Sequence, residues 1–112
     1  MMKKIGNLLL IVKENDTYTL SMTEQLQEDV GDIGFVEFNS DNDLEEDDSI
    51  VSIEASKTVL EIVTPLGGTV VERNLAAEDK PHLLNSDRAE DNWLVKLTNI
   101  DSTAFEALAD AE

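Results

Sequence analysis

Lys57 is the residue whose type and surroundings best suit chemistry. It stands alone between two apolar segments, residues 50–54 and 59–64, each with the composition of a β-strand. Two strands joined by a short polar segment form a hairpin, so we expect Lys57 at the tip with its amine in solvent. A neutral lysine amine can accept an activated acyl group. The sequence therefore predicts a carrier protein whose chemistry resides on a group attached to Lys57.

The other residues offer little for catalysis or metal binding. The chain has no cysteine, which excludes thiol catalysis, thiolate metal sites and disulfides. His82 is the single histidine, and no serine or paired carboxylates suggest a catalytic triad. Residues 41–48 include six acids, but a calcium loop needs glycine and glutamate where this segment has Glu46 and Ser52. We predict no catalytic residue, no metal site and an exposed acidic loop.

The charge of the chain restricts its partners. It has 25 acids and 8 bases among 112 residues, for a formal net charge of −17. Such a surface repels phosphate backbones and anionic lipids, so we expect no nucleic acid and no membrane as partners. Partners with basic patches would be attracted, although the charge is also explained by solubility alone. The length suits one domain with one core, residues 1–112, and we expect a monomer.

The first fourteen residues briefly resemble a signal peptide. Their apolar run covers only residues 8–12, charged residues follow at once, and no small-residue cleavage site appears. We read the segment as a first strand and expect the protein to be cytoplasmic.

The elements that position Lys57 follow from periodicity and turn signals. Residues 8–12 and 17–20 predict a hairpin, and residues 24–30 predict a short helix that Gly31 ends. Ser21 and Glu24 have capping-box spacing, and Thr23 is a competing cap.

Strand signals continue along the rest of the chain. In residues 32–38, Ile33 and Phe35 are expected on one face and Val36 and Phe38 on the other. Further strands are predicted at residues 69–73 and 93–97, the latter as the last strand. A helical turn is predicted from Pro81, and a C-terminal helix from a capping box at residues 103–106. The predicted fold is a mostly β sandwich or flattened barrel with short helices.

Several segments, in one register, resemble the H protein of the glycine cleavage system. Residues 23–38 resemble the segment before its lipoyl hairpin, and residues 54–57 resemble its Glu-Ser-Val-Lys motif. Pro65 and Gly68 match a proline and a glycine that follow the family's lysine. Residues 70–74, 81–85 and 92–96 resemble its later strand, Pro-x-Leu-x-Asn and Gly-Trp-Leu segments, so the match extends from about Asp16 to the C-terminus.

This resemblance implies a lipoyl-type hybrid barrel-sandwich with lipoate, the cofactor, in amide linkage on Lys57. It implies a carrier rather than an enzyme, modified by a lipoate-protein ligase or a lipoyltransferase. A lysine amine in water has a pKa of about 10.4, so on the order of one in a thousand is neutral at pH 7, and the partner enzyme must remove the proton. The residues expected to be recognised by that enzyme flank the lysine: Glu54, Ala55, Ser56, Thr58, Val59 and Glu61.

Two departures from the family pattern indicate its divergent H-like branch. Leu8-Leu9-Leu10 replaces His-Glu-Trp, and Thr58-Val59-Leu60 replaces Ala-Ala-Ser. Members of that branch are associated with lipoate relay and with a sirtuin and a macrodomain enzyme that add and remove ADP-ribose. The resemblance implies such a relay or a lipoate-dependent ADP-ribosylation redox response. The possible ADP-ribose acceptor region comprises Glu28, Asp29 and Asp32.

Three alternatives remain open. A conventional H protein would shuttle the aminomethyl group of glycine between a glycine decarboxylase and an aminomethyltransferase. A biotin carrier would share the hairpin, but biotinyl domains usually have methionine on both sides of the lysine, and here the neighbours are Ser56 and Thr58. An unmodified acidic β-domain would only bind a basic partner.

Overall fold

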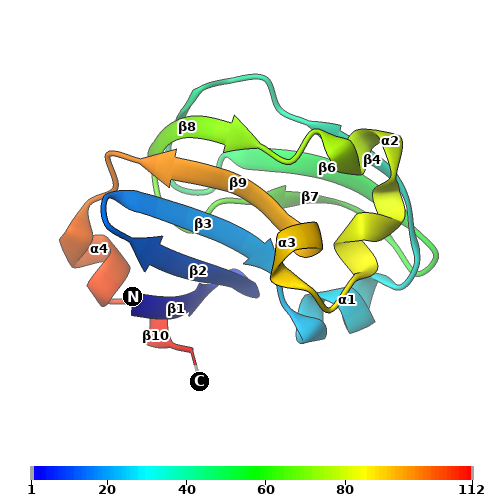
Figure 1. Ribbon diagram of the computed structural model, residues 1–112, viewed down its shortest axis with the longest axis horizontal. Helices are drawn as coiled ribbons and strands as arrows, with labels where there is room; N and C mark the ends of the chain where they lie inside the picture. The colour runs from blue at the N-terminus through cyan, green and yellow to red at the C-terminus, as the bar shows by residue number, and fades with distance from the viewer. Residues whose placement is uncertain (1, 112) are drawn as a thin grey trace.

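The computed structural model describes residues 2–111, which form two β-sheets and several short helices (Figure 1). Met1 and Glu112, the ends of the predicted domain, lie outside the described residues. One sheet has three strands, in the order β4 (Ile33–Phe38), β6 (Ser49–Ala55) and β7 (Val59–Val63). The other has seven, in the order β10 (Ala109–Asp110), β1 (Met2–Gly6), β2 (Leu9–Glu14), β3 (Thr17–Met22), β9 (Trp93–Thr98), β8 (Gly68–Arg73) and β5 (Asp43–Leu44).

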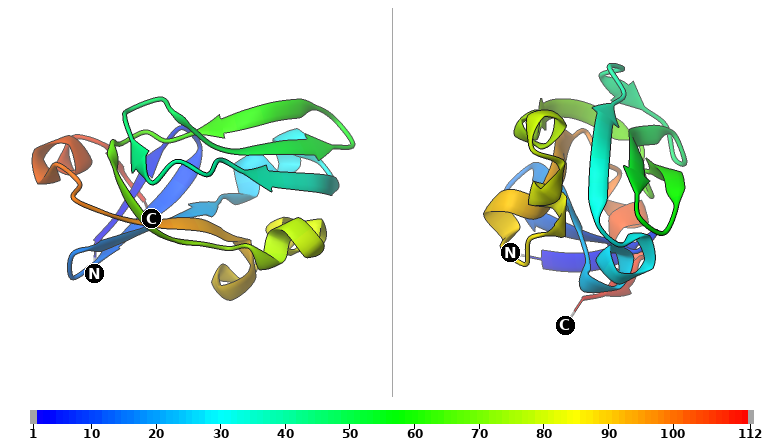
Figure 2. Two further views of the ribbon diagram at one scale, coloured as in Figure 1. Left: turned by 90° about the horizontal axis from the view of Figure 1, so that it is seen from above. Right: turned by 90° about the vertical axis from the view of Figure 1, so that its right-hand side faces the viewer.

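The two sheets lie face to face as layers, and their inward side chains form one apolar core (Figure 2). Strand alternation explains which side chains enter it. In β2, Leu9 and Ile11 are fully buried, whereas Leu10 and Val12 are partly exposed on the outer face. The predicted mostly β architecture is therefore confirmed.

The N-terminal segment forms two strands rather than the single strand that we predicted. Asn7 and Leu8 both have positive φ, 52° and 65°, and Gly6 pairs with Leu9 across this turn. Two consecutive positive φ angles are typical of the tightest hairpin turns, which favour Asn-Gly. Here leucine occupies the second position, so the usual sequence signal is absent. The predicted hairpin of residues 8–12 and 17–20 is confirmed as β2 and β3.

Helix α1 (Glu24–Val30) matches the prediction closely. Its cap is Thr23, whose hydroxyl accepts from the Leu26 amide at 3.1 Å, whereas Ser21 remains in β3. Leu26 and Val30 are buried, as their spacing predicts. Gly31 ends the helix and donates its amide to the Gln27 carbonyl.

The remaining helices are short. The helical turn predicted from Pro81 is confirmed as η1 (Pro81–Asn85), while α2 (Ala76–Asp79) and α3 (Ala89–Asn92) were not expected. The C-terminal helix α4 (Ser102–Glu106) is capped by Asp101, so the capping box predicted at residue 103 is wrong. Strand β9 is not the last strand, because β10 follows α4 and pairs with β1.

The acidic loop is exposed but anchored. Leu44 is buried in the short strand β5, which pairs with β8. The Arg73 guanidinium donates to the carbonyl oxygens of Asn39 and Asp41 and to the Asn42 side chain. Within residues 2–111, no group of three or more His, Cys, Asp or Glu side chains is arranged to hold a metal. No helix in that range has the length and apolar character needed to cross a membrane.

Candidate functional site

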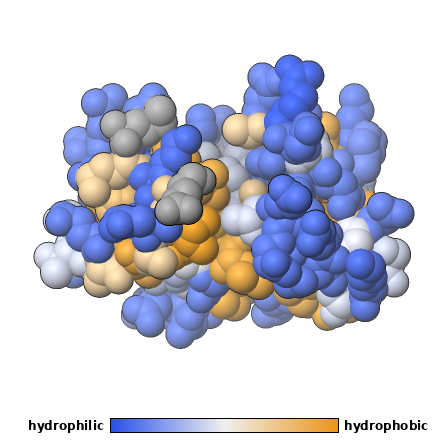
Figure 3. Space-filling model, turned by 90° about the horizontal axis from the view of Figure 1, so that it is seen from below, coloured by the Kyte–Doolittle hydropathy of each residue, from blue (hydrophilic) through white to orange (hydrophobic). Residues whose placement is uncertain are grey.

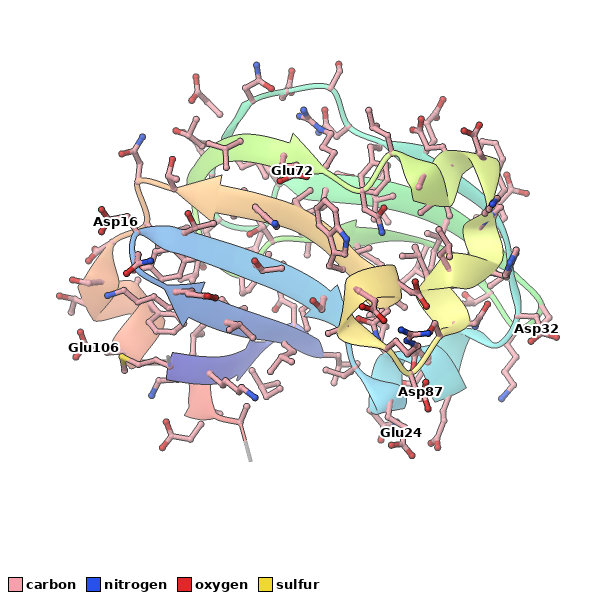
Figure 4. The ribbon with its side chains drawn as sticks, viewed as in Figure 1. Asp16, Glu24, Asp32, Glu72, Asp87 and Glu106 are labelled. Atoms are coloured by element: carbon pink, nitrogen blue, oxygen red, sulfur yellow. The ribbon has the colours of Figure 1, made fainter. Side chains whose placement is uncertain are left out.

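Lys57 lies in a three-residue loop at the tip of the β6–β7 hairpin. The pairing of Glu54 with Val59 fixes the ends of the loop, and the Ala55 amide donates to the Thr58 carbonyl at 2.9 Å. Ser56, Lys57 and Thr58 are all exposed. The hairpin reaches the right-hand end of the molecule, the end that Asp32 marks in Figure 4. The structure thus has Lys57 at an exposed hairpin tip, as the sequence predicts.

The tip is fixed against the end of α1 by three hydrogen bonds, two between backbone groups and one to the Ser56 hydroxyl. The Ser56 amide donates to the Asp32 carbonyl at 2.8 Å, and the Ser56 hydroxyl accepts from the Asp32 amide at 2.9 Å. The Lys57 amide donates to the Val30 carbonyl at 3.0 Å. Three hydrogen bonds to the 30–32 segment therefore define where the Lys57 side chain begins.

Gly31 permits this close approach. Its φ is 79°, a conformation that residues with a Cβ rarely adopt. A Cβ there would also lie 2.4 Å from the Ser56 hydroxyl and 3.0 Å from Lys57 Cγ. The Asn85 side chain secures the segment, because its amide donates to the Gly31 carbonyl and its oxygen accepts from the Ile33 amide, both at 2.8 Å.

The Lys57 amine contacts a helix end and not a carboxylate. Its Nζ donates to the Glu28 carbonyl at 2.9 Å, in the last turn of α1. The ion pairs of the described chain, Lys4–Asp110, Arg88–Glu90 and Lys96–Glu72, do not involve it. A cation is stabilised at the C-terminal end of a helix, where unpaired carbonyl groups concentrate negative partial charge. Glu54 and Glu61 flank Lys57 in sequence but do not pair with it.

An apolar pair and an acid form a row on the outer face of the three-stranded sheet. Phe35 pairs with Glu54, and Glu54 pairs with Val59, so the three lie side by side across β4, β6 and β7. Phe35 is 46% exposed and Val59 is 71% exposed. They line a shallow hollow of about 350 Å³ together with Asp32 and Ser56.

Sequence reasoning missed Phe35 because the β4 alternation is interrupted. A register shift between Ile33 and Phe35 places Ile33 on the buried side with Val36 and Phe38. The prediction that Ile33 and Phe35 share a face is therefore wrong. The sequence gives no clear signal here, because both faces of this segment include apolar residues.

Two of the three residues of the possible ADP-ribose acceptor region contact the hairpin tip. Asp32 contacts Ser56, and Glu28 provides the carbonyl that accepts from Lys57. Asp29 accepts a hydrogen bond from Gln25 within α1 instead. On the sheet, Glu61 lies opposite Ser52, which in turn lies opposite Glu37. Exposed acids thus lie on α1 and on the sheet behind the hairpin tip.

The comparison with protein families bears on this geometry. A family model described as glycine cleavage H-protein matches residues 4–112, which include the hairpin, α1 and both sheets. The chain belongs to the glycine cleavage H-protein family. Members of this family are carriers of covalently attached lipoate and not catalysts, and they work with glycine decarboxylase and aminomethyltransferase. Membership supports a lipoyl carrier role for this chain.

Two relatives refine the placement within the H-protein family. The chain is 53% identical over 110 residues to a glycine cleavage system H-like protein of Staphylococcus aureus, covering 98% of this chain and all of the relative. It is 40% identical over 100 residues to the glycine cleavage system H protein of Staphylococcus carnosus, covering 88% of this chain and 79% of the relative. The predicted resemblance to the family and to its H-like branch is confirmed.

A solved structure confirms the H-protein fold. The crystal structure of a glycine cleavage system H protein from Mycobacterium marinum matches with a TM-score of 0.74 at 24% identity, covering 87% of this chain and 82% of that one. The fold is thus the predicted lipoyl-type barrel-sandwich. The exposed Lys57, fixed at its backbone and free of carboxylate pairing in the described chain, suits covalent attachment of a lipoyl group.

Proposed function

We propose that this protein carries lipoate in amide linkage on Lys57 Nζ. The observation that carries the proposal is the exposed hairpin-tip lysine, held by the 30–32 segment in a chain of the H-protein family. Attached lipoate supplies a reversible disulfide to a chain that has no cysteine. The protein itself contributes a rigid base for the arm, which raises the local concentration of the arm at a partner's active site.

The acylation step requires help from a partner. Nζ must lose a proton before it can attack, and the contact that it makes in the described chain is with the Glu28 carbonyl, which is not a base. The ligase or transferase therefore provides both the activated acyl group and the base. An amide bond then forms between Nζ and the acyl carbon, the activating group leaves, and the proton passes to the partner's base.

The sheet beside Lys57 is proposed as the surface that this partner recognises. Phe35 and Val59 are apolar side chains exposed to solvent, and Glu54 lies between them. Exposed apolar side chains beside a modified residue suit burial against an enzyme. Ala55, Ser56, Thr58 and Glu61 complete the proposed recognition set.

Intact-mass measurement tests the attachment. The protein is incubated with lipoate, ATP and a lipoate-protein ligase, and the product is digested for peptide mapping. We expect one lipoyl-sized mass increase that maps to Lys57 and is lost in Lys57→Arg. The matched control is Lys80→Arg, which replaces a second exposed lysine. This variant should be lipoylated to the same extent as the parent protein. Absence of any adduct with several ligases and transferases would overturn the proposal.

We further propose that the lipoylated protein serves lipoate relay or a lipoate-dependent ADP-ribosylation response, with sirtuin and macrodomain partners. The higher identity to an H-like protein than to a conventional H protein supports this assignment. Glu28, Asp29 and Asp32 stay the candidate acceptor region for ADP-ribose. Efficient transfer of the glycine aminomethyl group by a glycine decarboxylase would favour the conventional H-protein role instead.

A further inference from the structure

The outer face of the seven-stranded sheet has a row of three apolar side chains and one serine, far from the Lys57 hairpin in sequence. Across β1, β2, β3 and β9, Ile5 pairs with Leu10, Leu10 with Ser21, and Ser21 with Trp93. Paired residues point to the same face of a sheet, so these four form a continuous line. Ile5, Leu10 and Trp93 are only partly buried, so their side chains are accessible to a partner.

This row is the floor of a groove. Two adjoining hollows of about 620 Å³ and 440 Å³ share Leu10, Ser21 and Ala89. Helix α3, the loop before it and the first turn of α1 form one wall, with Asp87 in that loop and Glu24 on α1. Figure 3 views the molecule from below, from the side of β1 and β10 in Figure 1, and shows hydrophobic residues in the middle of this view with hydrophilic residues on both sides.

The rim of the groove is acidic. Glu14, Glu24, Asp87 and Glu90 line it. Glu90 pairs with Arg88, but the ion pairs found within residues 2–111 leave the other three acids without a basic partner. Figure 4 shows Glu24 and Asp87 close together at the foot of α1 and α3.

Among residues 2–111, one lysine lines the groove, and it is already paired. Lys96 Nζ lies 3.4 Å from a Glu72 carboxylate oxygen and 5.2 Å from the centre of the Trp93 ring. Its charge is therefore balanced within the protein. The three acids give the groove a net negative rim around an apolar floor.

We propose that this groove binds a segment of a partner protein in which an apolar side chain is flanked by lysine or arginine. The apolar side chain would cover Leu10 and Trp93, and the basic residues would face Glu24, Asp87 and Glu14. Complementary charge favours such a segment and accelerates its association. A second copy of this chain is disfavoured, because both copies have a net charge of −17.

The groove is distinct from the lysine site and does not depend on the proposed function. The two sites contact opposite ends of α1: Glu24 lines the groove, while the Glu28 carbonyl accepts from Lys57. Loss of lipoylation in Lys57→Arg should therefore leave binding in the groove unchanged. This separates a failure of the groove proposal from a failure of the carrier proposal.

A peptide titration followed by NMR tests the groove. The probe is a synthetic twelve-residue peptide that alternates leucine and lysine, and the control peptide has serine in place of leucine. Amide shifts of ¹⁵N-labelled protein should change most at the residues that line the groove. The Leu10→Ser variant should bind about tenfold more weakly, the loss expected when one well-buried apolar contact is removed. The serine peptide, which has lost every leucine, should bind at least as weakly.

A matched pair of charge variants distinguishes binding of the peptide in the groove from its general attraction to the acidic surface. Glu24→Lys/Asp87→Lys and Asp16→Lys/Glu46→Lys each change two exposed acids, and both variants have a net charge of −13. Asp16 lies at the opposite end of the molecule from Glu24 and Asp87 (Figure 4). We expect the first variant to weaken binding about tenfold and the second less than about threefold.

Two results would overturn this proposal. Equal weakening by both charge variants, with shifts spread over the acidic loop, would show diffuse attraction to an acidic surface. Dimerisation of the free protein in sedimentation experiments, lost in Leu10→Ser, would identify a second copy as the occupant.

Discussion

At the residue scale, Lys57 depends on Gly31 more than on its acidic neighbours. The tip reaches the end of α1 only because the position beside Ser56 has no Cβ. The Lys57 ammonium then donates to the Glu28 carbonyl. The loop main chain is held by hydrogen bonds to Val30 and Asp32 and by the bond from the Ala55 amide to the Thr58 carbonyl. A lysine on a fixed base has fewer conformations to lose when an enzyme binds it.

Gly31→Ala should damage both the fold and the modification of Lys57. A Cβ at Gly31 would meet the Ser56 hydroxyl at 2.4 Å, and the backbone has a positive φ. We expect the free energy of unfolding to fall by about 2–3 kcal/mol, measured by urea denaturation followed by Trp93 fluorescence. Lipoylation of the folded fraction should also slow.

Gly34→Ala is the matched control for this prediction. The nearest atom to a Cβ at Gly34 is the Glu54 carbonyl oxygen at 4.0 Å, and the φ of Gly34 is not positive. Its unfolding free energy should stay the same or rise by up to about 1 kcal/mol. If both variants were equally destabilised, the contact between Gly31 and Ser56 would not be the cause.

At the element scale, the three-stranded sheet presents Lys57 and also a surface beside it. Strands β6 and β7 place Lys57 at their common end, and β4 adds Phe35 to the same end. The bulge in β4 turns Phe35 outward while Ile33, Val36 and Phe38 enter the core. A local irregularity of one strand thus determines what a partner meets.

Removal of the apolar pair should impair recognition without affecting the fold. In Phe35→Ser/Val59→Ser, we expect kcat/KM for lipoylation by a ligase to fall about tenfold or more, because each exposed side chain loses a contact area with the enzyme. Val71→Ser is the control, since Val71 is 56% exposed on β8, outside the β4–β6–β7 sheet. If the ligase modifies the parent, the double variant and Val71→Ser at the same rate, this surface is not what the ligase recognises.

At the scale of the whole molecule, one apolar core is surrounded by strongly acidic surface. The core cluster draws on both sheets, α1 and α4, where Phe105 packs edge-on against Tyr18 with ring centres 5.1 Å apart. Around it lie 25 acids and 8 bases. Repulsion among unbalanced surface charges opposes the compact state.

Salt should therefore stabilise the protein. Between 0.01 M and 0.5 M sodium chloride the screening length falls from about 30 Å to less than 8 Å. We expect Tm to rise by about 5 °C, equivalent to about 1 kcal/mol for a domain of this size, in calorimetry at constant pH. The rise should be smaller in Asp16→Lys/Glu46→Lys, which has fewer unbalanced charges. A Tm that is independent of salt would contradict this account.

The sequence determined the elements whose signals are local. The hairpin around Lys57, the helix that Gly31 ends and the outward acidic loop follow from periodicity, caps and charge, all of which act over a few residues. The register of matched segments also identified the family. By contrast, Asn7 and Leu8 form a turn without the residues that usually favour one. The bulge beside Phe35 could not be predicted either, because apolar residues occur on both faces of that strand.

Only the tertiary structure decided what lies beside each residue of the site. The contacts of Lys57 with Glu28 and Val30 join positions 27–29 residues apart, and Asn85 secures Gly31 from 54 residues away. The groove likewise needs strands from both ends of the chain to place Ile5, Leu10 and Trp93 in one line. Such proximity results from packing of the whole core, which no short segment specifies by itself.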